Sequence, residues 1–153
     1  MKYSYKQLFP TDVPFLKALL KVFGEAFNDV STYQDAVPSD TYLRSLLGEK
    51  NFIVVVAQDE TGNVVAGLAA YELRKFEQAR SEIYIYDLAV DERHRRKGIA
   101  TALIKTLQGI AKARRAYVIF VQADQDDHPA IKLYESRGIR ENVHHFDVPV
   151  PKD

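Results

Sequence analysis

The sequence contains no cysteine, which excludes disulfides, thiolate metal sites and a thiol nucleophile. It also has no run of about 18 apolar residues, the length that a membrane-spanning helix requires. Neither sign of charge dominates, since 21 Lys and Arg balance 21 Asp and Glu, and this balance argues against a nucleic-acid binder. Residues 1–5 lack the continuous apolar stretch of a signal peptide. We therefore expect a cytoplasmic protein with no membrane association.

The composition is that of an ordinary globular protein. With 153 residues, of which 46% are hydrophobic and 27% charged, we expect one domain over residues 1–153 that buries about two thirds of its unfolded surface. Its charges are segregated, because residues 93–123 hold eight Lys or Arg and no Asp or Glu. Acidic residues gather instead in residues 25–40 and 124–127. Solvated faces would explain this pattern, but it also suits an anionic ligand near the basic segment and a cationic one near the acidic segments.

Hydrophobic periodicity and turn residues predict a chain of alternating elements. Helices are expected from about residue 12 to residue 27 and at 39–47, 98–113 and 128–137, and strands at 3–8, 52–57, 64–73, 81–90, 117–122 and 143–148. The strand, helix and strand between residues 81 and 122 predict a parallel crossover, whereas residues 52–73 predict an antiparallel hairpin. We expect the last strand to close the sheet.

A basic turn joins the strand ending at Val90 to the helix that follows. Its spacing is Arg95-x-x-Gly98-x-Ala100. A strand end, a glycine and a helix start together present free N–H donors and the positive end of a helix dipole, which suit a pyrophosphate. The spacing matches neither the dinucleotide fingerprint nor the loop of nucleoside triphosphatases.

The element order, this turn and a later Ala130-x-x-x-Tyr134-x-x-x-Gly138 helix resemble the GCN5-related N-acetyltransferases. That resemblance implies an α/β fold: a mixed, mostly antiparallel sheet with one parallel crossover, splayed central strands and helices on both faces. It also implies acetyl-coenzyme A as co-substrate. The residues expected to bind it are Leu88, Ala89, Val90, Arg95, Arg96, Lys97, Gly98, Ile99, Ala100 and Thr101.

A closer resemblance extends along nearly the whole chain. Residues 22–25, 29–33, 75–78, 80–90, 116–124 and 138–141 are similar to the aminoglycoside 3-N-acetyltransferases of the gentamicin-resistance type. The resemblance implies acetyl transfer to the 3-amino group of a 2-deoxystreptamine antibiotic, and a homodimer.

Three residues are candidates for the chemistry. Asp87 lies in an otherwise apolar strand, where partial burial would raise its pKa toward that of a useful base for the acceptor ammonium. By resemblance, the N–H of Val90 stabilises the oxyanion and Tyr134 protonates the departing thiolate. A hydrogen-bonded carboxylate at a strand end and a core tyrosine are the structural alternatives for Asp87 and Tyr134.

A polycationic acceptor calls for carboxylates around it. Residues expected to bind the acceptor are Glu25, Asp29, Tyr33, Glu82, Tyr86, Asp124 and Asp147, with Glu82 also a weaker candidate base. His128 is a further candidate contact. No metal site is expected, because the adjacent His144 and His145 would point to opposite faces of a strand.

Without a cysteine nucleophile, we expect direct transfer in a ternary complex. Two alternatives stay open. The first alternative is an acetyltransferase for another amine, such as a polyamine or a peptide amine. The second is a non-catalytic module that binds acyl-coenzyme A or nucleic acid.

Overall fold

The structure, a computed structural model, describes residues 2–153. The chain forms two compact units, one ending at Gln122 and the other spanning Ala123–Asp153, and each is described by itself. The assignment of residues 1–153 to one domain stays a prediction. None of the helices in residues 2–153 is long and apolar enough to cross a membrane.

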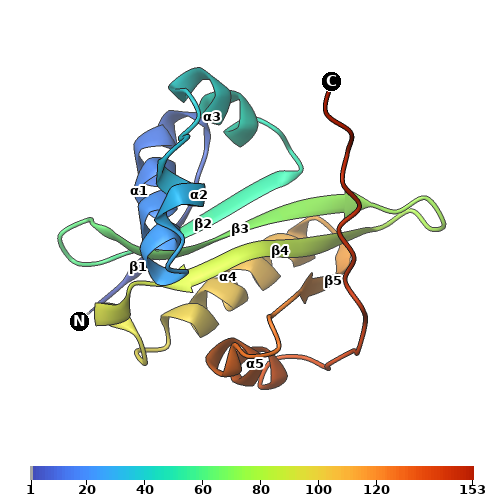
Figure 1. Ribbon diagram of the computed structural model, residues 1–153. Coiled ribbons are helices and arrows are strands. Elements are labelled where there is room, and N and C mark those ends of the chain that lie inside the picture. Colours follow the sequence, from blue (N-terminus) through green and yellow to red (C-terminus); the bar gives the residue numbers. More distant parts are fainter. Residues whose placement is uncertain (1) are drawn as a thin grey trace. The chain divides into compact units, whose positions relative to one another are not determined.

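The first unit is built on one five-stranded sheet with the spatial order β1-β2-β3-β4-β5 (Figure 1). Its strands are β1 (Ser4–Gln7), β2 (Phe52–Gln58), β3 (Val64–Arg74), β4 (Ser81–Val90) and β5 (Ala116–Val121). The first three pairings are antiparallel, and β4 pairs with β5 in parallel. The mixed sheet expected from the sequence is therefore confirmed.

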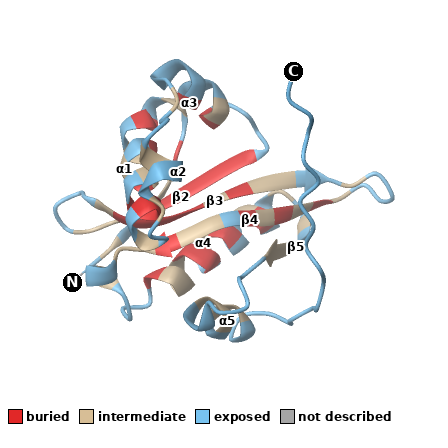
Figure 2. Cartoon of the chain, in the orientation of Figure 1, coloured by how far each residue is buried: buried red, intermediate tan, exposed pale blue. Residues whose placement is uncertain are grey.

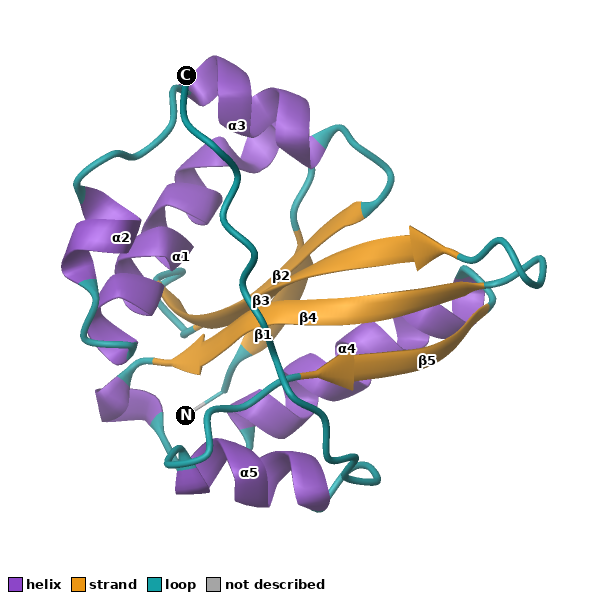
Figure 3. Ribbon diagram, turned by 45° about the vertical axis from the view of Figure 1, so that its right-hand side comes forward, coloured by secondary structure: helices purple, strands orange, loops and turns teal. Residues whose placement is uncertain are grey.

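Helices cover both faces of this sheet (Figure 3). One face carries α1 (Val13–Ala26), α3 (Asp40–Leu47) and the short α2 (Val30–Gln34), which packs on α1. The other face carries α4 (Ile99–Ala113), the crossover helix between β4 and β5. Short 3-10 turns, Pro10–Asp12 and Glu92–His94, precede α1 and α4.

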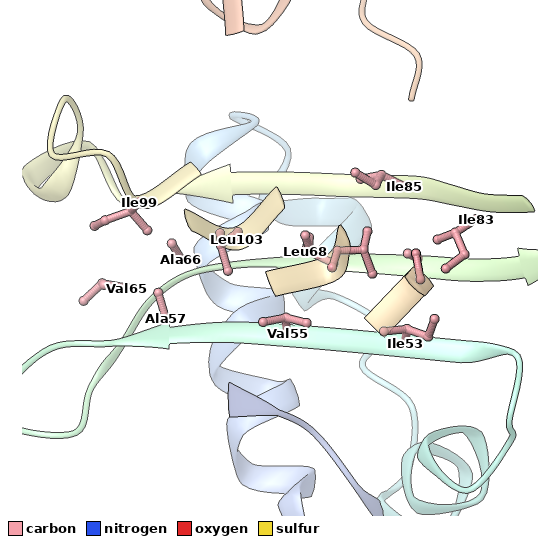
Figure 4. Close-up of a cluster of buried hydrophobic side chains, with 13 residues drawn as sticks. Ile53, Val55, Ala57, Val65, Ala66, Leu68, Ile83, Ile85, Ile99 and Leu103 are labelled. Carbon is pink, nitrogen blue, oxygen red and sulfur yellow. The ribbon is translucent and has the colours of Figure 1, made fainter. Parts of the chain in front are cut away.

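β2 is buried along nearly its whole length (Figure 2), and alternation divides its buried residues between two clusters. Ile53 and Val55 pack with Leu68, Leu103 and other residues on the α4 face, as Figure 4 shows. Val54 and Val56 belong to the cluster on the α1 face. Because β2 is buried on both sides, it reads as a continuous apolar run, as a central strand between two helix layers should.

A glycine brings α1 close to the sheet. A Cβ on Gly67 of β3 would lie 2.5 Å from Cδ1 of Leu19 and 2.8 Å from the carbonyl oxygen of Val55. The position therefore tolerates no side chain unless both α1 and the backbone of β2 move away. This close packing holds the helix layer against the end of β4 that carries the candidate site.

Two features differ from the sequence prediction. The helix α2 was not predicted, because five residues that include Val30, Ser31 and Thr32 are too short for a helical period. The predicted strand at 143–148 is wrong, since none of the described ladders includes these residues. A strand is stable only when a neighbour satisfies its backbone groups, and alternating hydrophobicity does not supply that neighbour.

The second unit contains α5 (His128–Glu135), which begins as predicted. The Asp127 carboxylate caps it by accepting from the N–H of Ala130, and Pro129 occupies its first turn. Beyond it, the N–H of Gly138 donates to the carbonyl of Tyr134. No helix or strand is assigned to residues 139–153.

Candidate active site

A β-bulge interrupts β4 where the candidate base lies. Ala70 pairs with Ile85 and the adjacent Ala69 pairs with Asp87, so Tyr86 is an extra residue on β4. Without the bulge, consecutive side chains would point to opposite faces. Here Ile85 points into the α4-side core, whereas both Tyr86 and Asp87 line a cavity on the α1 face.

That cavity, here called the acceptor cavity, has a volume of about 230 Å³. Leucines and aromatic rings of α1, α3 and the sheet form most of its wall, and Asp87 is its one charged lining residue. Tyr42, Tyr71 and Tyr86 also line it. A single carboxylate in a largely apolar wall is suited to receive one ammonium group together with the carbon framework that bears it.

The Asp87 carboxylate is half-buried and accepts a hydrogen bond of 3.0 Å from the hydroxyl of Tyr33 on α2. Burial raises the pKa of Asp87, and the hydrogen bond from Tyr33 partly opposes that rise. Burial and the nearby Asp87 carboxylate raise the pKa of Tyr33, which keeps its hydroxyl protonated as a donor. A carboxylate with a raised pKa in a cavity is a candidate general base.

Aromatic contacts hold these side chains. The ring centroid of Tyr33 lies 5.9 Å from that of Phe23, in α1, and 5.7 Å from that of Phe27, the residue that directly follows α1. Tyr86 is 63% exposed, and its ring makes edge contacts with Tyr71 and Tyr84. The aromatic rings therefore surround the carboxylate from α1, α2, β3 and β4.

The end of β4 has a free side. Its pairing with β5 stops where Ile85 meets Val121, so in the described ladders no strand pairs with residues 86–90 on that side. The N–H of Asp91 donates to the carbonyl of Val65, and by the alternation of an antiparallel ladder Ala89 and Asp87 also bond to β3. The backbone groups of Leu88 and Val90 therefore point to the free side. β4 and β5 therefore separate here, as the splayed central strands implied by the family resemblance require.

The basic turn after β4 is built by local bonds. Arg93 donates to both carboxylate oxygens of Asp91, at 3.1 and 2.9 Å, and this contact lowers the pKa of Asp91 to about 2. Nε of Arg95 donates to the carbonyl of Val90 at 3.2 Å. Arg95, Arg96 and Lys97 are exposed. The turn thus presents cationic side chains beside the free end of β4.

Gly98 begins α4 with a φ of 77°, in the left-handed region that favours glycine. A Cβ there would meet no described atom within 4 Å, so the backbone conformation, not crowding, calls for glycine. The first helical bond runs from Ala102 to Gly98, which leaves the N–H groups of residues 99–101 without a helical acceptor. Together with the dipole of a 15-residue helix, these donors form a site suited to phosphate.

The structure distributes the predicted acceptor residues unevenly. Tyr33, Tyr86 and Asp87 come together, whereas Glu25 lines a second cavity of about 230 Å³ with Asp91, Glu92, Arg93 and Arg95. Asp29 caps α2, and Glu82 accepts from the hydroxyl of Tyr117 and pairs with Lys75.

Asp124, Asp147, His128 and Tyr134 belong to the second unit. There Asp147 pairs with His145, and its carboxylate oxygen lies 2.9 Å from Nε2 of that histidine. Among residues 2–153, no group of three or more His, Cys, Asp or Glu is placed to hold a metal ion.

Sequence reasoning missed Tyr42 and Tyr71, which line the acceptor cavity. Tyr42 of α3 lines the cavity although it is 60% exposed. Tyr71 follows Ala69 on the α1 face of β3, so the strand alternation contained a usable signal.

Comparison with known proteins agrees with this geometry. Residues 16–139 match the acetyltransferase (GNAT) family. A solved aminoglycoside acetyltransferase from an uncultured soil metagenomic sample is 55% identical, with a TM-score of 0.96, over 99% of this chain and 100% of its own. A second, from an uncultured soil metagenomic sample and in complex with sisomicin, is 30% identical, with a TM-score of 0.90, over 97% of each chain.

A curated relative matches over a shorter region. N-acetyltransferase family 8 member 2 of Rattus norvegicus is 27% identical over 85 residues, which span 56% of this chain and 38% of that protein. The chain thus matches well under half the length of that relative.

The chain belongs to the acetyltransferase (GNAT) family. The family model crosses the boundary between the two compact units, since it extends to residue 139. The protein is therefore an acetyltransferase, and acetyl-coenzyme A is the acetyl donor of its family.

Proposed function

We propose that this enzyme transfers the acetyl group of acetyl-coenzyme A to the 3-amino group of 2-deoxystreptamine aminoglycosides of the gentamicin type. The observation that carries the proposal is the 55% identity, over 99% of the chain, to an aminoglycoside acetyltransferase. The relative in complex with sisomicin supports the same class of acceptor. The half-buried carboxylate of Asp87 in the acceptor cavity supports transfer to an amine.

The residues present fit acetyl-coenzyme A. Arg95, Arg96 and Lys97 would hold its phosphates together with the N–H groups of Gly98, Ile99, Ala100 and Thr101, because that helix start offers donors and positive charge. Leu88, Ala89 and Val90 would bind its extended arm, since Leu88 and Val90 present backbone groups on the free side of β4. When bound, the co-substrate supplies a thioester-activated acetyl group.

The chain's own residues would then move two protons and stabilise one charge. Asp87 would accept a proton from the acceptor ammonium, for which its raised pKa is an advantage over an ordinary aspartate. The N–H of Val90 would donate to the developing oxyanion, and Tyr134 would give a proton to the departing thiolate. The support for Tyr134 is its place in the Ala130, Tyr134, Gly138 spacing.

Tyr86 would contact the acceptor directly, because the bulge exposes its ring at the cavity. Glu25, Asp29, Glu82, Asp124 and Asp147 would attract the other ammonium groups of a polycation, together with His128. Of these, Asp29, Glu82 and Asp147 already have partners among the described residues, so we expect them to contribute less.

The acceptor cavity favours a second candidate function. It contains one carboxylate and is otherwise lined by apolar and tyrosine side chains, which suits a single amine on a largely hydrocarbon framework. An N-acetyltransferase of another small amine, or of a peptide amine, would meet that description.

One experiment separates the two. Turnover of acetyl-coenzyme A is measured against a panel of gentamicin, sisomicin and kanamycin-like aminoglycosides, simple polyamines and amine-bearing peptides, and NMR locates the acetylated nitrogen. We expect kcat/KM for the aminoglycosides to exceed that for the other amines by at least about 100-fold, a difference of about 2.7 kcal/mol. Faster acetylation of a polyamine or a peptide, or a product acetylated elsewhere than N3, would contradict the proposal.

The resemblance also implies a homodimer. Light scattering coupled to size-exclusion chromatography tests this assembly, with a mass near that of one 17.4 kDa chain as the contrary result.

A further inference from the structure

We propose that Tyr33 is a positioning residue, whose hydroxyl holds the Asp87 carboxylate at the wall of the acceptor cavity and extends acetyl transfer to lower pH. This inference rests on the proposed function, in which Asp87 is the base. It differs from the expectation that Tyr33 binds the acceptor, because the hydroxyl of Tyr33 donates to Asp87 at 3.0 Å.

The backbone around Tyr33 is built to present this hydroxyl. The N–H of Asp29 donates to the carbonyl of Gly24, so α2 begins directly against α1. A Cβ on Gly24 would lie 3.3 Å from Cβ of Tyr33, a separation tighter than most Cβ contacts. Glycine at this point therefore lets α2 come close enough for Tyr33 to reach the sheet.

The ring of Tyr33 has few alternatives to this position. It lies against both Phe23 and Phe27, at centroid distances of 5.9 and 5.7 Å, and those two rings also stack on each other. Packing against two rings restricts the side chain, so the hydroxyl is fixed before an acceptor binds. A fixed donor orients the carboxylate and favours its ionised form.

No other described group takes this role. The titratable groups near Asp87 or in the wall of the same cavity are phenols: Tyr33 from α2, Tyr42 from α3, Tyr71 from β3, and Tyr84 and Tyr86 from β4. The charge of Asp29, which precedes α2, raises the pKa of Tyr33. Within residues 2–153, no Lys or Arg forms an ion pair with Asp87. The hydroxyl of Tyr84 instead donates to Gln122 at 3.1 Å, which makes Tyr84 a matched control.

Two measurements on the full-length protein test the role. Carbon-13 NMR follows the titration of the Asp87 carboxyl in the wild type, Tyr33→Phe and Tyr84→Phe. The carboxyl signal is assigned to Asp87 because it is missing from the spectrum of Asp87→Asn. The pH dependence of kcat/KM is measured for the wild type and the two tyrosine variants with the best aminoglycoside of the panel. Tyr33→Phe keeps the ring packing and removes only the donor.

In Tyr33→Phe we expect the Asp87 carboxyl to titrate about one pH unit higher, as the loss of a hydrogen bond to a charged group predicts. The acid limb of kcat/KM should move up by the same amount, with activity about tenfold lower one unit below the wild-type limb and within about threefold of wild type well above it. Tyr84→Phe should leave both curves in place.

An Asp87 titration unchanged by Tyr33→Phe, or one shifted equally by Tyr84→Phe, would overturn the proposal. So would a shifted titration with an unmoved acid limb. If the wild type acetylates aminoglycosides and any of these results is found, only the role of Tyr33 is refuted, and the proposed function stands. If the wild type acetylates no aminoglycoside, the proposed function is refuted. The role of Tyr33 in catalysis is then refuted as well, even if Tyr33→Phe shifts the titration of the Asp87 carboxyl.

Discussion

Asp87 combines two properties that oppose each other in a folded protein. Its place beside the bulge brings the carboxylate into a mostly apolar cavity, where burial penalises its charge. The same burial raises its pKa and makes it a better proton acceptor. At the scale of the residue, the fold therefore gives up some stability to hold a functional group.

Replacing Asp87 by asparagine tests both effects together. We expect kcat to fall by about 10²- to 10⁴-fold, the usual contribution of a general base, while calorimetry finds the affinity for acetyl-coenzyme A nearly unchanged. Asp40→Asn, which removes the charge of an exposed residue in the first turn of α3 that pairs with Lys17, is the control. Wild-type turnover in Asp87→Asn would exclude Asp87 as the base.

The same variant should change the pH dependence of stability. A pKa that is raised in the folded state means that the contribution of Asp87 to stability is fully present below its unfolded pKa, about 3.9, and is lost as the pH rises through its folded pKa. Asp87→Asn should therefore be more stable than the wild type at pH 7, by a Tm increase on the order of 2 °C. Thermal unfolding should show this difference vanish below about pH 3.

Tyr134 offers a second prediction at this scale. Tyr134→Phe removes the proposed acid but retains the ring, so kcat should fall by about 10- to 100-fold while acetyl-coenzyme A binds as before. The matched control is Tyr117→Phe, whose hydroxyl bonds to Glu82. Equal losses in the two variants would attribute the effect to general disturbance of the fold.

At the scale of the element, α4 connects the core to the basic turn. Its buried face, with Leu103 and Leu107, packs on the sheet, and its first amides lie beside Arg96 and Lys97. Because α4 is anchored along 15 residues, the donors at its start have a fixed direction. The helix thus links the packing of the core to the proposed phosphate site.

Two glycines of this helix give opposite predictions. Gly98→Ala forces an alanine into a left-handed conformation and should destabilise the protein by about 1 kcal/mol and weaken acetyl-coenzyme A binding, because a side chain enters the proposed phosphate site. Gly109→Ala should stabilise it by about 0.5–1 kcal/mol, since Gly109 is helical and a Cβ there meets no described atom within 4 Å.

Urea unfolding and calorimetry measure the two effects in the same pair of variants. Unchanged affinity in Gly98→Ala would contradict the position proposed for the phosphates. The affinity of Gly109→Ala should match that of the wild type.

At the scale of the whole molecule, the chain has neither net charge nor a cysteine. The first property means that any field that attracts an anionic donor and a cationic acceptor must come from local segregation, as in the basic turn, where Arg95, Arg96 and Lys97 are exposed. The second means that the protein has no thiol that could carry the acetyl group as a covalent thioester intermediate. The lack of a thiol favours direct transfer between two ligands held at once.

Initial rates test this directly. With both substrates varied, direct transfer predicts double-reciprocal lines that intersect, because both ligands must be bound before the acetyl group moves. Parallel lines, or acetylated protein detected by mass spectrometry without an acceptor, would indicate a covalent intermediate and overturn the ternary complex.

Much of this protein follows from patterns within short stretches of sequence. The apolar steps of α1 and α4, the alternation of β3 and β4, and the Arg95, Gly98, Ala100 turn predicted the main elements and the proposed phosphate site. The predictions of the main elements succeed because periodicity and turn chemistry depend on residues a few positions apart, whereas the phosphate site stays a prediction. The strand expected at 143–148 failed for the same reason, because pairing depends on a distant partner.

The sequence by itself determined the α/β class, the order of the strands and helices up to α5 except for the short α2, the basic turn and the exclusion of thiol chemistry. Only the tertiary structure decided that the Ala69 and Ala70 register makes Tyr86 a bulge, that Tyr33 bonds to Asp87 across 54 positions, and that Tyr42 and Tyr71 complete the cavity wall. The physical reason is that register and side-chain contacts are set by elements packing against one another, which no local pattern encodes.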